Sequence, residues 1–177
     1  GVAPVSDGRR RIGKGRPGMT SVADLKREAA EAAVEEVQDG MVLGLGTGST
    51  VARFLEALAR RIQDGELPNV RGVPTSVQTA TEAHSMAIPL TNLDDDPVIQ
   101  LAVDGADEVD LDLDLIKGLG GALLREKVVA QASERLVIIA DETKLVERLG
   151  TRSPVPVETL PFAMSHVRRF AEGLCAE

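Results

Sequence analysis

The stretch VDGADEVDLDLDLIKGLGGALLREKVV, residues 103–129, gathers most of the residues in this sequence that suit acid–base chemistry. It holds seven carboxylates and three cationic side chains around a glycine cluster. Asp104 and Asp107 flank a glycine turn; two nearby carboxylates repel each other, which raises the pKa of one and suits it to moving protons. Lys117 can stabilise an oxyanion, and Glu126 can take a proton from carbon.

Each of these residues also has an ordinary structural interpretation, and the stretch alone leaves both open. Asp-Gly sequences commonly form polar turns. The segment EVDLDLD is in part expected to be a solvated face. Glu126 stands between Arg125 and Lys127, as a surface charge would. The choice depends on the elements that position these side chains.

Strand and helix patterns alternate along the chain. Helical patterns cover residues 21–40, 47–63, 75–87 and 120–133, and short apolar strand patterns cover 41–46, 69–74, 88–93, 97–104 and 135–141. This alternation predicts an α/β fold with a mostly parallel, Rossmann-like sheet flanked by helices. Ligands of such sheets bind at the carboxyl ends of the strands. The residues with chemical potential fall at those ends, which favours a site over scattered surface charge.

Two hydroxyl-rich loops follow predicted strands. GLGTGST (44–50) offers backbone N–H groups, the hydroxyls of Thr47, Ser49 and Thr50, and a helix N-terminus, which together suit a phosphate group. An ordinary strand-to-helix turn with a hydroxyl cap explains the same residues. GVPTS (72–76) opens another helix, where capping is the simpler interpretation. Asp141 and Lys144 stand at one more strand end, where a salt-bridged turn is the default.

Composition excludes several classes of protein. The net charge is −8 although residues 1–18 are basic, and the chain has three Phe, no Trp and no Tyr. Nucleic-acid binding is therefore not expected. Two distant histidines and one cysteine, Cys175, argue against a metal site and an intramolecular disulfide, and no apolar run is long enough to span a bilayer. We expect no metal and no cofactor.

The chain is expected to divide into three parts. Residues 1–18 are interpreted as a disordered basic arm or a cloning remnant, with a nucleic-acid-binding arm as the alternative. Residues 19–150 would form the α/β catalytic domain. Residues 151–177 contain three prolines, one possible strand and an amphipathic helix. They would begin a second, small α+β domain that the chain does not finish.

A phosphate cradle, a carboxylate base and a lysine suit proton transfer next to a carbonyl, as in aldose–ketose isomerisation of a sugar phosphate through an enediolate. Five motifs, GLGTGST, GVPTS, VDGADEVD, KGLGGALLREKVV and IIADETKLV, closely resemble type A ribose-5-phosphate isomerase in order and spacing. The resemblance covers residues 20–162. It implies interconversion of ribose 5-phosphate and ribulose 5-phosphate in the non-oxidative pentose phosphate pathway, without a metal, by a cytoplasmic homodimer or homotetramer.

The resemblance also implies roles for single residues. Glu126 would move the proton between C1 and C2, Lys117 and Asp104 would handle charge and protons on the sugar oxygens, and Asp107 would hold hydroxyl groups. The residues implied to contact the substrate are Lys26, Thr47, Gly48, Ser49, Thr50, Asp104, Gly105, Ala106, Asp107, Lys117, Gly118, Gly120, Gly121 and Lys144.

The sequence departs from the family pattern in two places. Leu119 stands where members usually carry Gly or Arg, and the family's C-terminal T-D-N-x-N and G-V-x-x-x-G-L-F segments do not occur. A fragment of a longer protein is therefore expected. Two rival functions remain: a catalytically silent sugar-phosphate-binding or interaction module, and a nucleotide-cofactor enzyme, against which the lack of G-x-G-x-x-G and Walker spacing counts.

Overall fold

The computed structural model describes residues 21–174, so the predicted arm at residues 1–18 and Cys175 lie outside the described residues. The α-helices are α1 (Val22–Val34), α2 (Ser49–Gln63), α3 (Val77–Ser85), α4 (Leu123–Gln131) and α5 (Met164–Leu174). The strands are β1 (Val42–Leu45), β2 (Arg71–Pro74), β3 (Leu101–Asp104), β4 (Glu108–Val109), β5 (Leu115–Ile116) and β6 (Leu136–Ile138). Two 3₁₀ turns, η1 (Glu142–Lys144) and η2 (Pro161–Ala163), complete the set.

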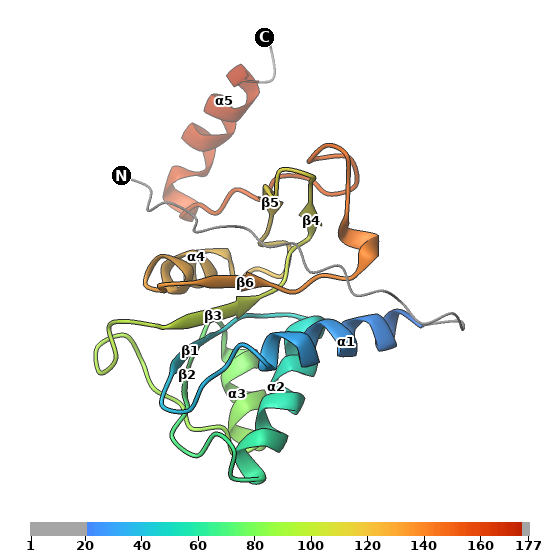
Figure 1. Cartoon of the computed structure of the whole chain (residues 1–177). Coiled ribbons are helices and arrows are strands. Elements are labelled where there is room, and N and C mark those ends of the chain that lie inside the picture. Colours follow the sequence, from blue (N-terminus) through green and yellow to red (C-terminus); the bar gives the residue numbers. More distant parts are fainter. Residues whose placement is uncertain (1–20, 175–177) are drawn as a thin grey trace.

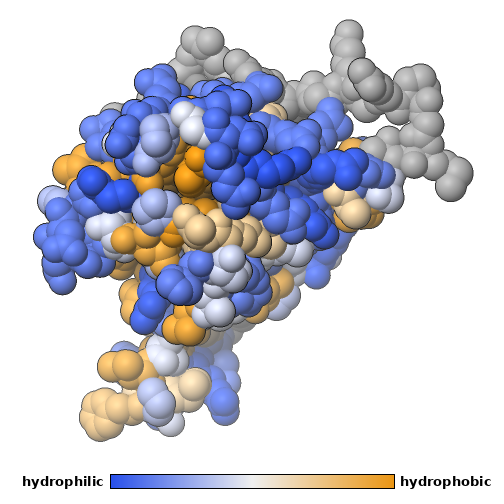
Figure 2. All heavy atoms as spheres, turned by 90° about the horizontal axis from the view of Figure 1, so that it is seen from below, coloured by the Kyte–Doolittle hydropathy of each residue, from blue (hydrophilic) through white to orange (hydrophobic). Residues whose placement is uncertain are grey.

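Four parallel strands form the central sheet in the order β2-β1-β3-β6. Helices cover both faces, with α1, α2 and α3 on one side and α4 on the other (Figure 1). This confirms the predicted α/β architecture with a mostly parallel sheet. Seen from the side of α2 and α3, the surface is mainly hydrophilic, with patches of apolar residues among the polar ones (Figure 2).

Alternating side chains of the strands supply two separate cores. Leu43, Leu45, Leu101 and Val103 face the larger core, which includes Phe54 and Leu58 of α2. Val42 and Ala102 face the smaller core, together with Val129 of α4. Asp104 follows Val103 along β3, so it lies on the α4 face of the sheet.

The strand order reverses between β1 and β3. The chain leaves β1 through α2 to β2 on one side, and later returns to β3 on the other side of β1. At such a switch point the loops after the two strands part, which leaves a crevice at their carboxyl ends. The register pairs Leu45 with Val103, so Gly46 and Asp104 lie side by side at this point.

Two expectations about strands were wrong. Residues 88–93 form no strand; only a bridge joins Leu90 to Gly72, and Pro89 has no N–H to extend the pairing. The predicted buried strand at 135–141 is a short edge strand, β6, with Leu136 40% exposed. The EVDLDLD segment is in part a solvated face, as expected, because residues 111–114 are exposed; its first two residues, Glu108 and Val109, are buried and form β4, which pairs with β5 in an antiparallel hairpin.

Residues 151–174 form no strand, contrary to one possibility in the sequence. This segment contains η2 and α5, and neither element has a buried residue. Among residues 21–174, no helix combines the length and the apolar character that crossing a membrane requires.

Candidate active site

Asp104 ends β3 at the switch point and is 4% exposed. Its Oδ1 accepts hydrogen bonds from the backbone N–H groups of Thr47 (3.2 Å) and Gly105 (2.7 Å). Its Oδ2 lies 3.0 Å from the Lys117 ammonium. Burying a carboxylate is unfavourable unless its oxygens are hydrogen-bonded and its charge is paired, and this position provides both.

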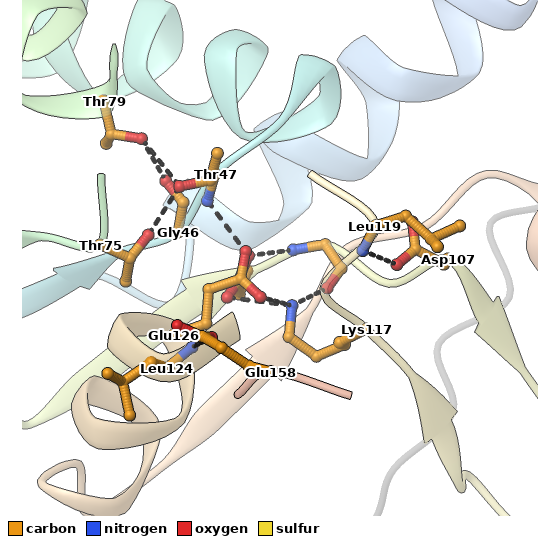
Figure 3. Close-up of polar contacts among 12 residues, drawn as sticks. Gly46, Thr47, Thr75, Thr79, Asp107, Lys117, Leu119, Leu124, Glu126 and Glu158 are labelled. Atoms are coloured by element: carbon orange, nitrogen blue, oxygen red, sulfur yellow. Dashed lines mark hydrogen bonds and ion pairs between the residues drawn. The ribbon is translucent and has the colours of Figure 1, made fainter. Parts of the chain in front are cut away.

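Lys117 directly follows β5 and reaches back over the end of the sheet. Its ammonium donates to the Gly105 carbonyl and forms ion pairs with Asp104 and with Glu126, whose Oε2 is 3.4 Å away. The cation therefore lies between two carboxylates from different elements (Figure 3). The end of β3, the residue after β5 and helix α4 thus bring together three side chains that are far apart in the sequence.

Glu126 is the second of these carboxylates and is 5% exposed. With Ala122 and Val129 it forms the inner face of α4, because these residues are four and three positions apart. Helix α4 begins at Leu123, not near Gly120 as expected, because Gly118 and Gly121 adopt positive φ values of 103° and 76°. Glu126 consequently lies in the first turn rather than the second.

Burial raises the pKa of Glu126, the negative charge of Asp104 raises it further, and the neighbouring Lys117 only partly offsets both. Oε2 of Glu126 accepts no hydrogen bond from any residue in the described range. A carboxylate that is buried, under-solvated and beside a cation is a good candidate for a proton-transfer group. The charge of Asp104 thus acts on Glu126, whereas the sequence suggested an effect between Asp104 and Asp107.

Asp107 lies at the start of the β4–β5 hairpin. Its Oδ2 accepts the N–H of Leu119 at 3.0 Å, and its own N–H donates to Ile116 at 2.8 Å. The side chain is half-buried. It therefore braces the glycine-containing turn after Lys117, and Figure 3 shows it on the Lys117 side of the site.

The 44–50 loop forms the opposite wall. Gly48, with φ of 120°, is the N-cap of α2 and supplies no side-chain cap. The alternative of a hydroxyl-capped turn therefore does not apply here, and within residues 21–174 no side chain caps the N–H groups at the start of this helix. Lys26 on α1 donates to the Ser49 hydroxyl at 2.8 Å. A cation, a hydroxyl and a helix N-terminus thus meet at one place.

Thr75 and Thr79 support this loop, whereas the sequence favoured only helix capping for their segment. Thr79 donates to the Gly46 carbonyl at 2.8 Å, and Thr75 donates to the Leu45 carbonyl at 3.1 Å. The Thr47 hydroxyl lies 2.8 Å from that of Thr75 and 3.2 Å from that of Thr79. Thr75 and Thr79 donate their hydroxyl hydrogens to these carbonyls. The Thr47 hydroxyl is therefore the donor toward the oxygens of Thr75 and Thr79. Its side chain holds the loop from within (Figure 3).

Gly46 is expected to be intolerant of a side chain. A Cβ at this position would lie 2.2 Å from Oδ1 of Asp104 and 2.7 Å from its backbone Cα. A Gly46→Ala variant should therefore lose about 1–3 kcal/mol of unfolding free energy, as overpacked cores do, measured by urea denaturation. Gly173→Ala is the matched control, because nothing lies within 4 Å of that position in α5. Equal stability of the two variants would contradict this account of Gly46.

The remaining predicted residues lie around this centre. Gly105 and Ala106 connect β3 to β4, Gly118, Gly120 and Gly121 form the turn into α4, and Thr50 lies in the first turn of α2. Lys144 ends η1, and within residues 21–174 its side chain makes no polar contact with Asp104, Lys117 or Glu126. No group of three or more His, Cys, Asp or Glu side chains in that range is arranged to hold a metal ion.

Two further carboxylates escaped prediction. Glu108 is 1% exposed and binds the backbone of residues 150–153, and Glu158 binds the N–H of Leu124. The alternation of V-D-L-D-L-D is typical of a strand, but β4 ends at Val109 and residues 111–114 are exposed, so this pattern gave no signal for Glu108. For Glu158 no sequence pattern indicated the contact.

Comparisons with known proteins agree with this geometry. A family profile described as ribose 5-phosphate isomerase A (phosphoriboisomerase A) matches residues 71–176. Ribose-5-phosphate isomerase A of Desulfatibacillum aliphaticivorans is 51% identical over 159 residues, which cover 90% of this chain and 69% of that protein. The protein of the same name from Nitrobacter hamburgensis is 59% identical over 145 residues, which cover 82% of this chain and 61% of that one.

Solved structures give the same result. A D-ribose-5-phosphate isomerase in complex with phospho-erythronic acid superposes with a TM-score of 0.84 at 41% identity, over 86% of this chain and 66% of that one. Ribose 5-phosphate isomerase A of Methanocaldococcus jannaschii gives a TM-score of 0.83 at 44% identity, over 87% and 68%. The chain thus spans about two thirds of the length of these proteins. In sequence and in fold, this chain belongs to the ribose 5-phosphate isomerase A family.

Proposed function

We propose that this chain carries the machinery for interconverting D-ribose 5-phosphate and D-ribulose 5-phosphate through an enediolate. The observation that carries the proposal is the arrangement around Lys117: one ammonium between the buried carboxylates of Asp104 and Glu126, at the switch point of the sheet. Aldose–ketose isomerisation needs a base for a carbon-bound proton and a cation for the oxygen that becomes negative. Glu126 and Lys117 supply these two groups.

In the proposed reaction the Glu126 carboxylate removes the proton from C2 of the open-chain aldose. The C2–H electron pair forms the C1=C2 double bond, and the carbonyl electrons move onto O1, where the Lys117 ammonium stabilises the charge. The proton of the O2 hydroxyl passes to O1, which becomes the C1 hydroxyl, and as the O2 electrons form the C2 ketone the double bond takes back at C1 the proton held by Glu126. Asp104 and Asp107 would bind the sugar hydroxyl groups and exchange protons with them. No atom is gained or lost overall.

The phosphate group would bind at the other wall of the site. Lys26, Ser49 and the uncapped start of α2 offer a charge, a hydroxyl and free N–H groups, which is a favourable environment for a phosphate. Phospho-erythronic acid, the compound bound in a related structure, carries both an anionic carboxylate and a phosphate. We propose that it binds this chain with its carboxylate at Lys117 and its phosphate at Lys26.

NMR of the chain with ribose 5-phosphate in D₂O tests the proposal. We expect ribulose 5-phosphate to form with solvent deuterium on carbon, because a carboxylate base exchanges its proton with water. Unphosphorylated ribose should react far more slowly, since the second wall of the site would be empty. Binding of phospho-erythronic acid without any turnover would instead identify a silent sugar-phosphate-binding module.

We further propose that residues 19–150 form the catalytic domain and that residues from 151 onward belong to a second, smaller unit. All the proposed catalytic groups lie in the former. In the latter, Leu160, Phe162 and Phe170 are 74, 101 and 66% exposed, which suits packing against another polypeptide segment. A homodimer or homotetramer in the cytoplasm, where phosphorylated sugars are retained, is the proposed assembly. Light scattering after size-exclusion chromatography tests its mass.

A further inference from the structure

Glu108 is a buried carboxylate whose hydrogen bonds go to the backbone of residues 150–153 and not to Asp104, Lys117 or Glu126. Its Oε2 accepts the N–H of Gly150 at 2.6 Å, and its Oε1 accepts those of Arg152 at 2.5 Å and Ser153 at 2.6 Å. Burial raises the pKa of Glu108, but these backbone hydrogen bonds outweigh it and hold the pKa below its ordinary value. Charge-assisted bonds of this kind are strong and geometrically demanding. Glu108 thus fixes the backbone of residues 150–153.

The place of Glu108 connects this contact to the site. It follows Asp107 directly, and successive side chains of a strand point to opposite faces, so Asp107 faces Leu119 while Glu108 faces residues 150–153. It also pairs with Ile116, the residue before Lys117. The hairpin that carries Lys117 is therefore joined to residues 150–153 through one carboxylate.

The same segment reaches the helix of the base. Glu158 Oε2 accepts the N–H of Leu124 at 2.8 Å, in the first turn of α4. The N-cap of this helix is Ala122, which has no side-chain oxygen to do so. Glu126 follows two residues later, and Figure 3 shows Glu158 beside Leu124 and below Glu126. We call residues 150–158 the strap, because it is bound to the Lys117 hairpin at one end and to α4 at the other.

We infer that Glu108 and Glu158 are positioning residues, which act through the strap to set the location of Glu126 relative to Lys117. The need for them follows from the site itself. Oε2 of Glu126 has no hydrogen-bond partner among residues 21–174, and its 3.4 Å ion pair with Lys117 is longer than a hydrogen bond. A pair that does not lock its own geometry must be held by the elements that carry it. The catalytic consequence of this inference rests on the proposed function.

Glu158→Ala is the main test, with Glu147→Ala as the matched control on an exposed acid of the preceding segment. In Glu158→Ala we expect faster hydrogen exchange of the Leu124 amide and a Glu126 carboxyl that titrates closer to its ordinary pKa, because a loosened first turn lets water in. With ribose 5-phosphate, kcat should fall about 10- to 10²-fold while KM changes little. Glu158→Gln keeps an acceptor oxygen and should recover most of kcat.

The outcomes separate the strap from the proposed function. If Glu158→Ala leaves both the Leu124 exchange and the Glu126 titration as in the parent chain, the strap does not position α4 and the inference fails, whatever the activity. If both change but kcat does not, the positioning role fails. If both change in a chain that turns over no substrate, the strap stands and the isomerase proposal falls. Glu108→Gln should alter the Glu126 titration in the same direction.

Discussion

A Glu126→Gln variant is expected to bind ribose 5-phosphate nearly as well as the parent chain and to convert it about 10²- to 10⁴-fold more slowly, the usual contribution of a general base. Glutamine has the same shape and keeps an oxygen toward Lys117, but an amide cannot take a proton from carbon. Solvent deuterium should disappear from the sugar carbons together with turnover. Glu134→Gln is the control, because Glu134 is an exposed acid just beyond the same helix. A Glu126→Gln variant with parental kcat would exclude Glu126 as the base.

The raised pKa of Glu126 gives the same variant a signature in stability. Between the ordinary value of 4.5 and the raised value, the folded chain binds more protons at this carboxyl than the unfolded chain does. By linkage, its contribution to the unfolding free energy falls as pH rises through that window. Glu126→Gln removes the contribution, so the variant should gain stability relative to the parent as pH rises, by about 1.4 kcal/mol for each unit of pKa shift.

Activity should follow the opposite course over the same range. The base must be ionised, so kcat/KM of the parent chain should rise with pH through the raised pKa of Glu126. Its acid limb should therefore lie above pH 4.5. Urea unfolding and initial rates, each measured from pH 4 to 8, check the two trends together. Parallel pH profiles of stability for parent and variant would mean that the carboxyl titrates normally and that the buried position assigned to it is wrong.

The sequence predicted the fold because its strands and helices are locally distinct. β1, β2 and β3 are short, mainly apolar runs; β1 is followed by Gly46, β2 ends in Pro74 and β3 ends in Asp104, and α2 shows a clear apolar face. The carboxyl ends of parallel strands meet at one edge, so the convergence of Gly46 and Asp104 followed from the pattern alone. Lys117 and Glu126 were candidates by residue type and place in the pattern, and the family resemblance implied their roles; spacing alone left Glu126 as a possible surface charge.

What the sequence did not predict depends on tertiary contacts. Glu108 reads as one acid among many in an acidic segment, and only the folded segment 150–153 places three N–H groups against it. The start of α4 was placed too early because the positive φ angles of Gly118 and Gly121 cannot be told from composition. β6 is as apolar as a central strand, but its exposure depends on which neighbour lies beyond it.

A Lys117→Met variant is expected to show the largest loss of stability among these substitutions. The methionine side chain is about as long as that of lysine, but it leaves Asp104 and Glu126 buried without their shared cation. Removing one partner of a buried ion pair destabilises by about 3–5 kcal/mol, because it leaves an uncompensated charge behind. Lys127→Met, on the exposed side of α4, should be nearly neutral, and thermal and urea unfolding at pH 7.5 compare the two.

The stability lost in Lys117→Met should be greater at high pH than at low pH. Lys117 normally lowers the pKa of Glu126 against burial and the charge of Asp104. Without it, the pKa of Glu126 rises further, so the folded variant holds its proton over a wider range and loses stability as pH rises through that range. Lowering the pH should therefore restore most of the stability but none of the turnover, because the oxyanion still lacks its cation. A variant equally unstable at pH 5 and pH 7.5 would show that Lys117 acts through packing and not through the charge it places between the two carboxylates.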